Sequence, residues 1–232
     1  MITSGTYNFN PSLGEIVLNA YARCGIRRTA LVQEHMQDAR FETNLMLASW
    51  ANQGVNLWEV DLVTVPLIQG QTTYAVDAKT VMILDAYIQY NGGTTSQFDR
   101  VIMPISRTEY AQTPNKNLEA PPTAFWFDRL INPTITLWPV PDQTGIYSLQ
   151  YYRVHQIQDA ELTDAQTVDI PYRWLDAMCA GLAARVGAIY APERLQMLEA
   201  KADQAYTVAA TQDTENVPLY IMPGLSGYFR TS

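Results

Sequence analysis

The sequence predicts an α+β protein, in which a four-helix bundle is interrupted by an inserted antiparallel β-domain and followed by an extended C-terminal arm. Apolar residues recur at helical spacing near both ends of the chain. Between them, short runs with alternating apolar and polar residues are divided by turn signals. We therefore expect a helical bundle of residues 1–57 and 169–211, an inserted β-domain of residues 58–168 and an arm of residues 212–232.

Two helices are predicted near the N-terminus. Ser12 and Glu15 have the spacing of a capping box, and Gly25 is suited to end the helix that they begin. A second helix is expected from about Leu31 to Gln53. Its apolar face consists of Val32, Met36, Ala39, Met46, Leu47 and Trp50.

The middle of the chain predicts short antiparallel strands. Apolar and acidic residues alternate over Trp58–Leu62, and a second capping box, Ser106 with Glu109, predicts one short helix. Further strands are expected at residues 72–76, 81–90, 98–103, 123–128, 134–138 and 145–155. Strands joined by short turns favour a small sandwich or a curved sheet.

Two consecutive helices, Asp169–Tyr190 and Pro192–Thr211, are predicted after the β-domain. We expect Asp169 to cap the first, and Pro192 fits the first turn of the second. The first helix has an apolar stripe of Leu175, Met178, Leu182, Val186 and Ile189, and beside it a stripe of Ala177, Gly181, Ala184 and Ala188. Small side chains permit close approach of another helix, so we expect this hairpin to pack on the N-terminal helices.

The arm combines helix-breaking and apolar residues. Pro218, Pro223, Gly224 and Gly227 exclude a long helix. Its apolar residues, which a disordered tail would lack, are Leu219, Tyr220, Ile221, Met222, Leu225, Tyr228 and Phe229. An apolar segment that cannot form its own core is expected to dock on a partner; packing on its own subunit is the alternative.

The composition restricts the partners. The chain of 232 residues is 47% hydrophobic and 16% charged, and its 14 Tyr favour protein–protein contacts. The net charge of -8 argues against a sequence-independent grip on nucleic acid, although it is compatible with a wall past which DNA slides. The N-terminus lacks the regions of a signal peptide and no run of apolar residues is long enough to span a membrane. We expect a soluble protein, made in the cytoplasm, with no membrane contact.

The residue inventory gives little support to catalysis or metal binding. Cys24 and Cys179 lie on predicted helix faces and are interpreted as buried free thiols. His35 is expected on the polar side of its helix, and His155 ends a strand. Two Cys and two His so far apart do not supply a zinc site. We expect no catalytic residue, no metal and no cofactor.

Acidic residues of the segment before the terminal hairpin are interpreted as a solvated loop. They are Asp159, Glu161, Asp164 and Asp169. A calcium site is the alternative, but the spacing lacks an EF-hand loop and its glycine.

Several motifs in consecutive order resemble a known family. Val65–Tyr74, in which Gly70 is followed four residues later by Tyr74, leads to the strand around Ile88, as at the start of the β-region in that family. Pro104–Ala111 resembles the short helix that follows a strand in the same family. Pro122–Asp128 followed by Ile135–Asp142 is similar to a "P-x-x-Y/F-W … I-x-L-x-P-x-P" stretch. The order resembles that of the head-to-tail adaptors of short-tailed phages, known as tail accessory factor or tail tubular protein A, over roughly residues 10–210.

The resemblance implies a structural virion protein without catalysis. It implies a homo-oligomeric ring, expected to have 12 subunits, which docks on the portal protein and contacts the nozzle or tube proteins of the tail. Genomic DNA would pass through the ring without specific binding, and the C-terminal arm would reach the portal.

Two other functions remain open from the sequence. One is a different structural component of a phage tail or baseplate. The other is a glycan-binding module or hydrolase that uses Trp126, Trp138 and Tyr147. An exposed row of these aromatic residues would favour the second, whereas their burial would favour the adaptor.

Overall fold

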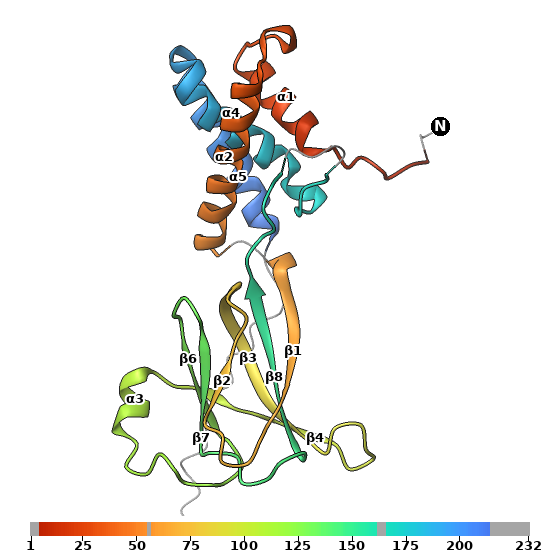
Figure 1. Ribbon diagram of the computed structural model, residues 1–232. Helices are drawn as coiled ribbons and strands as arrows, with labels where there is room; N and C mark the ends of the chain where they lie inside the picture. Colours follow the sequence, from red (N-terminus) through yellow and green to blue (C-terminus); the bar gives the residue numbers. More distant parts are fainter. Residues whose placement is uncertain (1–4, 55–56, 162–165, 214–232) are drawn as a thin grey trace, which may run out of the picture.

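The chain folds as an α+β protein in the computed structural model, which describes residues 5–54, 57–161 and 166–213. Within these residues there are five α-helices and two four-stranded sheets. The helices Leu13–Arg23, Gln33–Asn52, Leu175–Tyr190 and Leu195–Gln212 lie at one end of the molecule, and both sheets lie at the other (Figure 1). The predicted α+β class is therefore confirmed.

Helix α4 (Leu175–Tyr190) is the centre of the helical part. Helices α1 (Leu13–Arg23), α2 (Gln33–Asn52) and α5 (Leu195–Gln212) each pack against α4 and make few contacts with one another in the described residues. A helix covered on three sides must be apolar over most of its circumference, as α4 is. The exact arrangement predicted as a four-helix bundle is not confirmed.

Small residues of α4 bring its neighbours close. A Cβ atom added at Gly181 would lie 2.7 Å from Sδ of Met46 on α2, and one added at Gly187 would lie 2.5 Å from Cδ1 of Leu198 on α5. Both distances are below any ordinary contact. The predicted stripe of small residues therefore does permit the close approach of another helix, since Gly181 lies directly against α2.

The helix ends agree only partly with expectation. Ser12 and Glu15 form the predicted capping box, in which the Glu15 N–H donates to Ser12 Oγ at 3.3 Å. Asp169, however, does not cap α4, which follows a short 3₁₀ helix, Tyr172–Trp174. The reason is Pro171, whose ring disfavours helical geometry at the residue before it. Two members of the predicted apolar faces are exposed: Val32, which precedes the first residue of α2, and Ile189.

The strands form two sheets that face each other across one core. The first sheet has the order β1 (Val60–Pro66), β8 (Tyr147–His155), β3 (Thr80–Tyr90), β4 (Phe98–Val101). The second has the order β2 (Thr73–Ala75), β7 (Thr134–Trp138), β6 (Ala124–Asp128), β5 (Met103–Pro104). Fully buried side chains between them are Ile88, Ile102, Ile135, Leu137 and Leu149.

One strand pair differs from the predicted antiparallel β-domain. Strand β5 pairs with β6 in parallel. The single strand expected at residues 98–103 is divided at Ile102, whose N–H donates to Ala86 of the first sheet, whereas the N–H of Met103 donates to Thr123 beside the second. The chain therefore passes from one sheet to the other here and meets β6 in the same direction.

Helix α3 (Arg107–Gln112) lies against strand β6 of the second sheet. Its N-cap, Ser106, forms the predicted capping box with Glu109. The ring of Tyr110 lies 5.6 Å from that of Trp126, and Nε1 of Trp138 donates to the carbonyl of Asn115 at 3.0 Å.

Buried apolar residues form two separate clusters, one in each part of the molecule. Ile157 and Ala160 fall within the predicted β-domain of residues 58–168, yet they are buried in the helical cluster. The domain boundaries predicted from the sequence stay predictions. No helix in the described ranges is long and apolar enough to cross a membrane.

Candidate functional site

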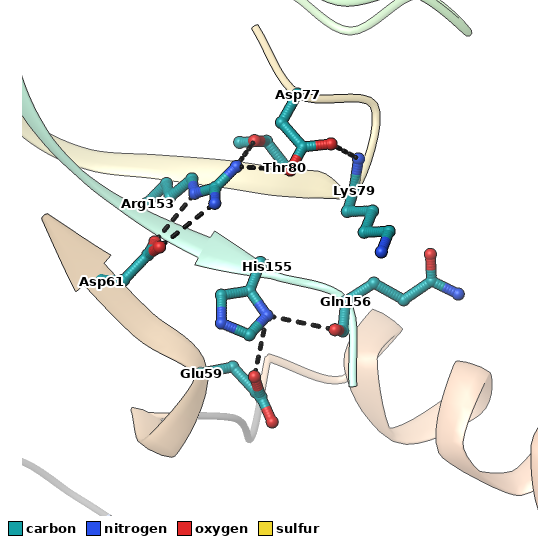
Figure 2. A network of polar contacts seen from close by, with 8 residues as sticks. All are labelled: Glu59, Asp61, Asp77, Lys79, Thr80, Arg153, His155 and Gln156. Carbon is teal, nitrogen blue, oxygen red and sulfur yellow. Dashed lines mark hydrogen bonds and ion pairs between the residues drawn. The ribbon is translucent and has the colours of Figure 1, made fainter. Parts of the chain in front are cut away.

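The main network of ionisable side chains lies at the joint between the two parts (Figure 2). A 3₁₀ helix, Leu57–Glu59, precedes β1, and its Glu59 is only 3% exposed. His155, at the end of β8, places Nδ1 2.8 Å from Oε2 of Glu59. This polar contact lies directly beside the pairing of β1 with β8, which begins at Val60 and Val154.

The environment of Glu59 favours its protonated form. Burial, and after it the Asp169 carboxylate, raise the pKa of Glu59 to about 7, against the opposing effect of His155. The indole Nε1 of Trp58 donates to the carbonyl of Asp169 at 3.2 Å, which keeps that residue beside the joint. Asp169 therefore belongs to this cluster rather than to a solvated loop.

Arg153 holds three strands together next to this pair. Its guanidinium donates two hydrogen bonds to the Asp61 carboxylate, at 2.8 and 3.1 Å, and further ones to Asp77 and to Thr80 Oγ1, each at 3.1 Å (Figure 2). This contact lowers the pKa of Asp61. Because the partners lie on β1, on the turn before β3 and on β3 itself, Arg153 fixes the end of the sheet that faces the helices.

A cavity of about 590 Å³ opens beside the network. Its lining includes Lys79, Arg153 and His155, and the exposed acidic residues Asp159 and Glu161. Charges of both signs thus face it. Within the described ranges no group of three or more His, Cys, Asp or Glu residues is placed to hold a metal ion. Asp164 of the predicted acidic loop lies outside the described residues.

The cysteines and the other histidine take part in packing. Cys24 is buried and its Sγ donates to the carbonyl of Ala183 at 3.3 Å, whereas Cys179 is only half-buried. Burial raises the pKa of both thiols, which disfavours the thiolate form. His35 does not lie on a purely polar face, because its ring stacks on Tyr190 at 4.5 Å.

The aromatic residues considered for glycan binding do not form an exposed row. Tyr147 is 5% exposed and packs in the core between the sheets. Trp126 and Trp138 are half-buried under the segment that contains α3. Because an exposed row of these residues would have favoured glycan binding, their burial favours the adaptor.

The N-terminal segment presents an aromatic surface that the sequence did not single out. It leads away from α1 and the rest of the helical part (Figure 1). Tyr7 is 99% exposed, and Phe9 meets the exposed ring of Tyr172 edge-on at 6.4 Å. A groove of about 800 Å³ runs beside them over Ile16 and Leu175. The sequence feature that could have indicated this surface is the presence of two aromatic residues, Tyr7 and Phe9, in an otherwise polar N-terminal stretch.

A second exposed apolar surface lies on α2. Phe41 and Leu45 point away from α4, and a groove of about 600 Å³ is lined by Phe41, Met36 and Arg40. Exposed apolar side chains of this size are typical of surfaces that contact other proteins.

Comparison with known proteins decides the family. A family model described as SU10 adaptor protein matches residues 28–221. The chain belongs to the SU10 adaptor protein family. The SU10 adaptors are phage head-to-tail adaptors, so the family predicted from the sequence is confirmed, and the chain is a structural component of a phage virion. A search of curated proteins found no match.

The adaptor match includes α2, both sheets, α4 and α5, and begins after α1. The exposed Tyr7 and Phe9 therefore lie outside the matched range. The predicted arm residues Leu219, Tyr220, Ile221, Met222, Leu225, Tyr228 and Phe229 lie outside the described residues.

The last described residue, Asp213, is held in place at the end of α5. The Asp213 carboxylate is buried and forms an ion pair with Arg173, whose guanidinium lies 5.9 Å from the centre of the Trp58 ring. The end of α5 is thus tied to the same region as the joint.

Proposed function

We propose that this SU10 adaptor docks on the portal protein of its phage, extends the DNA channel and attaches the tail. The observation that carries this proposal is the family match over residues 28–221. The exposed apolar residues of the N-terminal segment and of α2 support it, because an adaptor must contact several neighbours at once.

The proposed assembly is a ring, expected to have 12 subunits, that forms when subunits meet the portal. Each part of the subunit buries its own apolar cluster, so an isolated chain needs no neighbour to close its core. We therefore expect the purified protein to be monomeric. Size-exclusion chromatography with light scattering measures this, and a stable ring in the absence of portal would contradict the portal-triggered step.

DNA is proposed to pass through the ring without being held. The chain carries a net charge of -8, and carboxylates repel the phosphates that Lys and Arg would bind. An acidic channel wall would leave the genome free to move during ejection.

The C-terminal arm is proposed to dock on the portal. Burying each large apolar side chain of the arm would stabilise the complex by about 1.5–3 kcal/mol. Ordering the backbone costs about 1–2 kcal/mol for each residue, so the net gain from one arm is small. Repetition around a ring would make the attachment strong.

Deletion of residues 217–232 tests this docking. The truncated protein should keep its melting temperature and lose portal binding in a pull-down, because the arm contributes to the complex rather than to the core. A matched control is Met197→Ser on α5, which changes an exposed apolar residue outside the proposed contact surfaces, leaves the arm intact and should keep portal binding. A truncated protein that melts much lower and still binds portal would show that the arm packs on its own subunit.

A further inference from the structure

The groove of about 800 Å³ beside the N-terminal segment is lined by apolar residues of two helices. Ile16 and Leu18 come from α1, and Leu175 and Cys179 come from α4, which packs against α1. Tyr172, which also lines the groove, is 75% exposed. Exposed apolar side chains around a groove are typical of a surface that another segment of protein covers.

The described part of the chain ends beside this groove. Its last residue, Asp213, forms an ion pair with Arg173, and Arg173 is itself part of the groove lining. The residues that follow Asp213 therefore start close to the groove. Six residues of extended chain span about 20 Å, so residues 214–219 are long enough to bring Leu219 and the apolar residues after it over the groove.

The Asp213 carboxylate indicates a direction for the chain that follows it. Its Oδ1 accepts a hydrogen bond from Nε of Arg173 at 3.0 Å, whereas its Oδ2 is buried and has no hydrogen-bond partner among the described residues. A buried acceptor without a donor is costly, and an Asp side chain commonly accepts from the backbone N–H two residues further on. The N–H of Glu215 would satisfy Oδ2, and the turn so formed would lead the chain back toward Arg173.

The charges of the groove suit the start of the arm. The charged residues of its lining are two carboxylates and three guanidinium groups: Glu15, Asp176, Arg23, Arg28 and Arg173. Arg23 pairs with Asp176 and Arg173 with Asp213, while Arg28 has no ion pair within residues 5–54, 57–161 and 166–213. Glu215 supplies a carboxylate at the second position after Asp213.

The rest of the arm has the chemistry that an apolar groove requires. Residues 217–229 include no charged residue. Pro218 and Pro223 favour an extended backbone, which fits a groove without a neighbouring strand. Tethering raises the effective concentration of a segment to about millimolar, so the arm of the same chain would cover the groove in preference to a second copy.

We propose that in the free subunit the arm, residues 214–232, lies in the groove between α1 and α4 and covers Cys179. Because the cost of ordering the backbone offsets most of the apolar burial, this contact is weak and its loss should hardly change the melting temperature. The arm can therefore leave the groove when a stronger partner is present. The proposal concerns the subunit alone and does not depend on docking to the portal.

The two natural cysteines provide the test. Cys179 lines the groove and reports whether the groove is covered, whereas Cys24 is buried in the helical cluster and reports whether the helices separate. The full chain and the chain without residues 217–232 are treated with a maleimide, and mass spectrometry of the peptides gives the rate at each thiol.

Deletion of residues 217–232 should expose Cys179. If the arm covers the groove about nine-tenths of the time, Cys179 should react about tenfold faster without it, and Cys24 should stay slow in both chains. In the full chain, the double substitution Tyr220→Ser and Leu225→Ser should have a similar effect. Thr231→Ala, outside the apolar residues of the arm, is the matched control and should leave the rate at Cys179 unchanged.

Cross-linking tests the position of the arm directly. Ser226→Cys in the full chain with Cys24→Ala should join to Cys179 through a short bis-maleimide, with the mass of one subunit. The matched control replaces Cys179 by Ser and the exposed Gln204 on α5 by Cys, and it should give much less product, because the arm is held at the groove and not over α5.

Equal rates at Cys179 with and without the arm would overturn the proposal. If Cys24 also reacts faster in the truncated chain, the cross-linking decides: equal yields at Cys179 and at Gln204→Cys would reject the proposal. A product with the mass of two subunits would reject it as well, since the arm would then lie on a second copy. None of these samples contains portal, so their failure is distinct from a failure of portal docking.

Discussion

Replacing Glu59 by Gln should change the stability of the protein in a way that depends on pH. Compared with the unsubstituted chain, the variant should gain stability as the pH rises from acidic to neutral and alkaline values. Burial raises the pKa of Glu59 from 4.5 to about 7. At about 1.4 kcal/mol for each pKa unit, this difference corresponds to about 3 kcal/mol. The folded chain holds the proton more tightly than the unfolded one, so the stabilisation is complete below pH 4.5 and is lost as the pH rises through 7.

The amide introduced by Glu59→Gln cannot ionise and does not suffer this loss. The free energy of unfolding of the unsubstituted chain, minus that of Glu59→Gln, should therefore fall by about 3 kcal/mol between about pH 4.5 and 7.5. Urea denaturation followed by circular dichroism at several pH values measures both.

Asp61→Asn is the matched control for this measurement. Arg153 lowers the pKa of Asp61, so the stabilisation by Asp61 is present above its ordinary pKa and should not change between about pH 5 and 8. If the difference in the free energy of unfolding between the unsubstituted chain and Glu59→Gln is also independent of pH, as expected for Asp61→Asn, the reasoning about the burial of Glu59 is refuted.

Three further predictions concern the cores, α3 and DNA. Leu182→Ala on α4, where the side chain is fully buried, should lower the free energy of unfolding by about 2–5 kcal/mol in urea, whereas Met197→Ala on the exposed side of α5 should change it by less than about 0.5 kcal/mol. Ser106→Ala should cost about 1 kcal/mol and speed hydrogen exchange in residues 107–112, because it removes the cap of α3; unchanged exchange would contradict this. Duplex DNA should show no gel shift at physiological salt, and sub-micromolar binding would reject an inert channel wall.

The features predicted correctly are those that neighbouring residues determine. Both capping boxes join residues three positions apart, and both are present. The small residues of α4 indicated close helix contacts, and Gly181 makes one. Pro171 shows the limit of such rules, since a helix begun at Asp169 would have had to pass through the geometry that the proline disfavours.

The features that were missed depend on tertiary contacts. The transfer of the chain between sheets at Ile102, and hence the parallel pairing of β5, follows from how the two sheets face each other. Glu59 lies in an alternating run, where an acidic residue at the start of a strand is expected to face solvent. Its burial against His155 requires the helical part to be placed above the sheet end, which no local pattern encodes.

Docking on the portal is the central claim, and electron microscopy of the purified protein mixed with its portal tests it most directly. We predict a closed ring of twelve subunits on one face of the portal, with an open central channel, and no ring in samples without portal. Particles in which the folded, full-length protein leaves the portal bare at saturating concentration would contradict the claim.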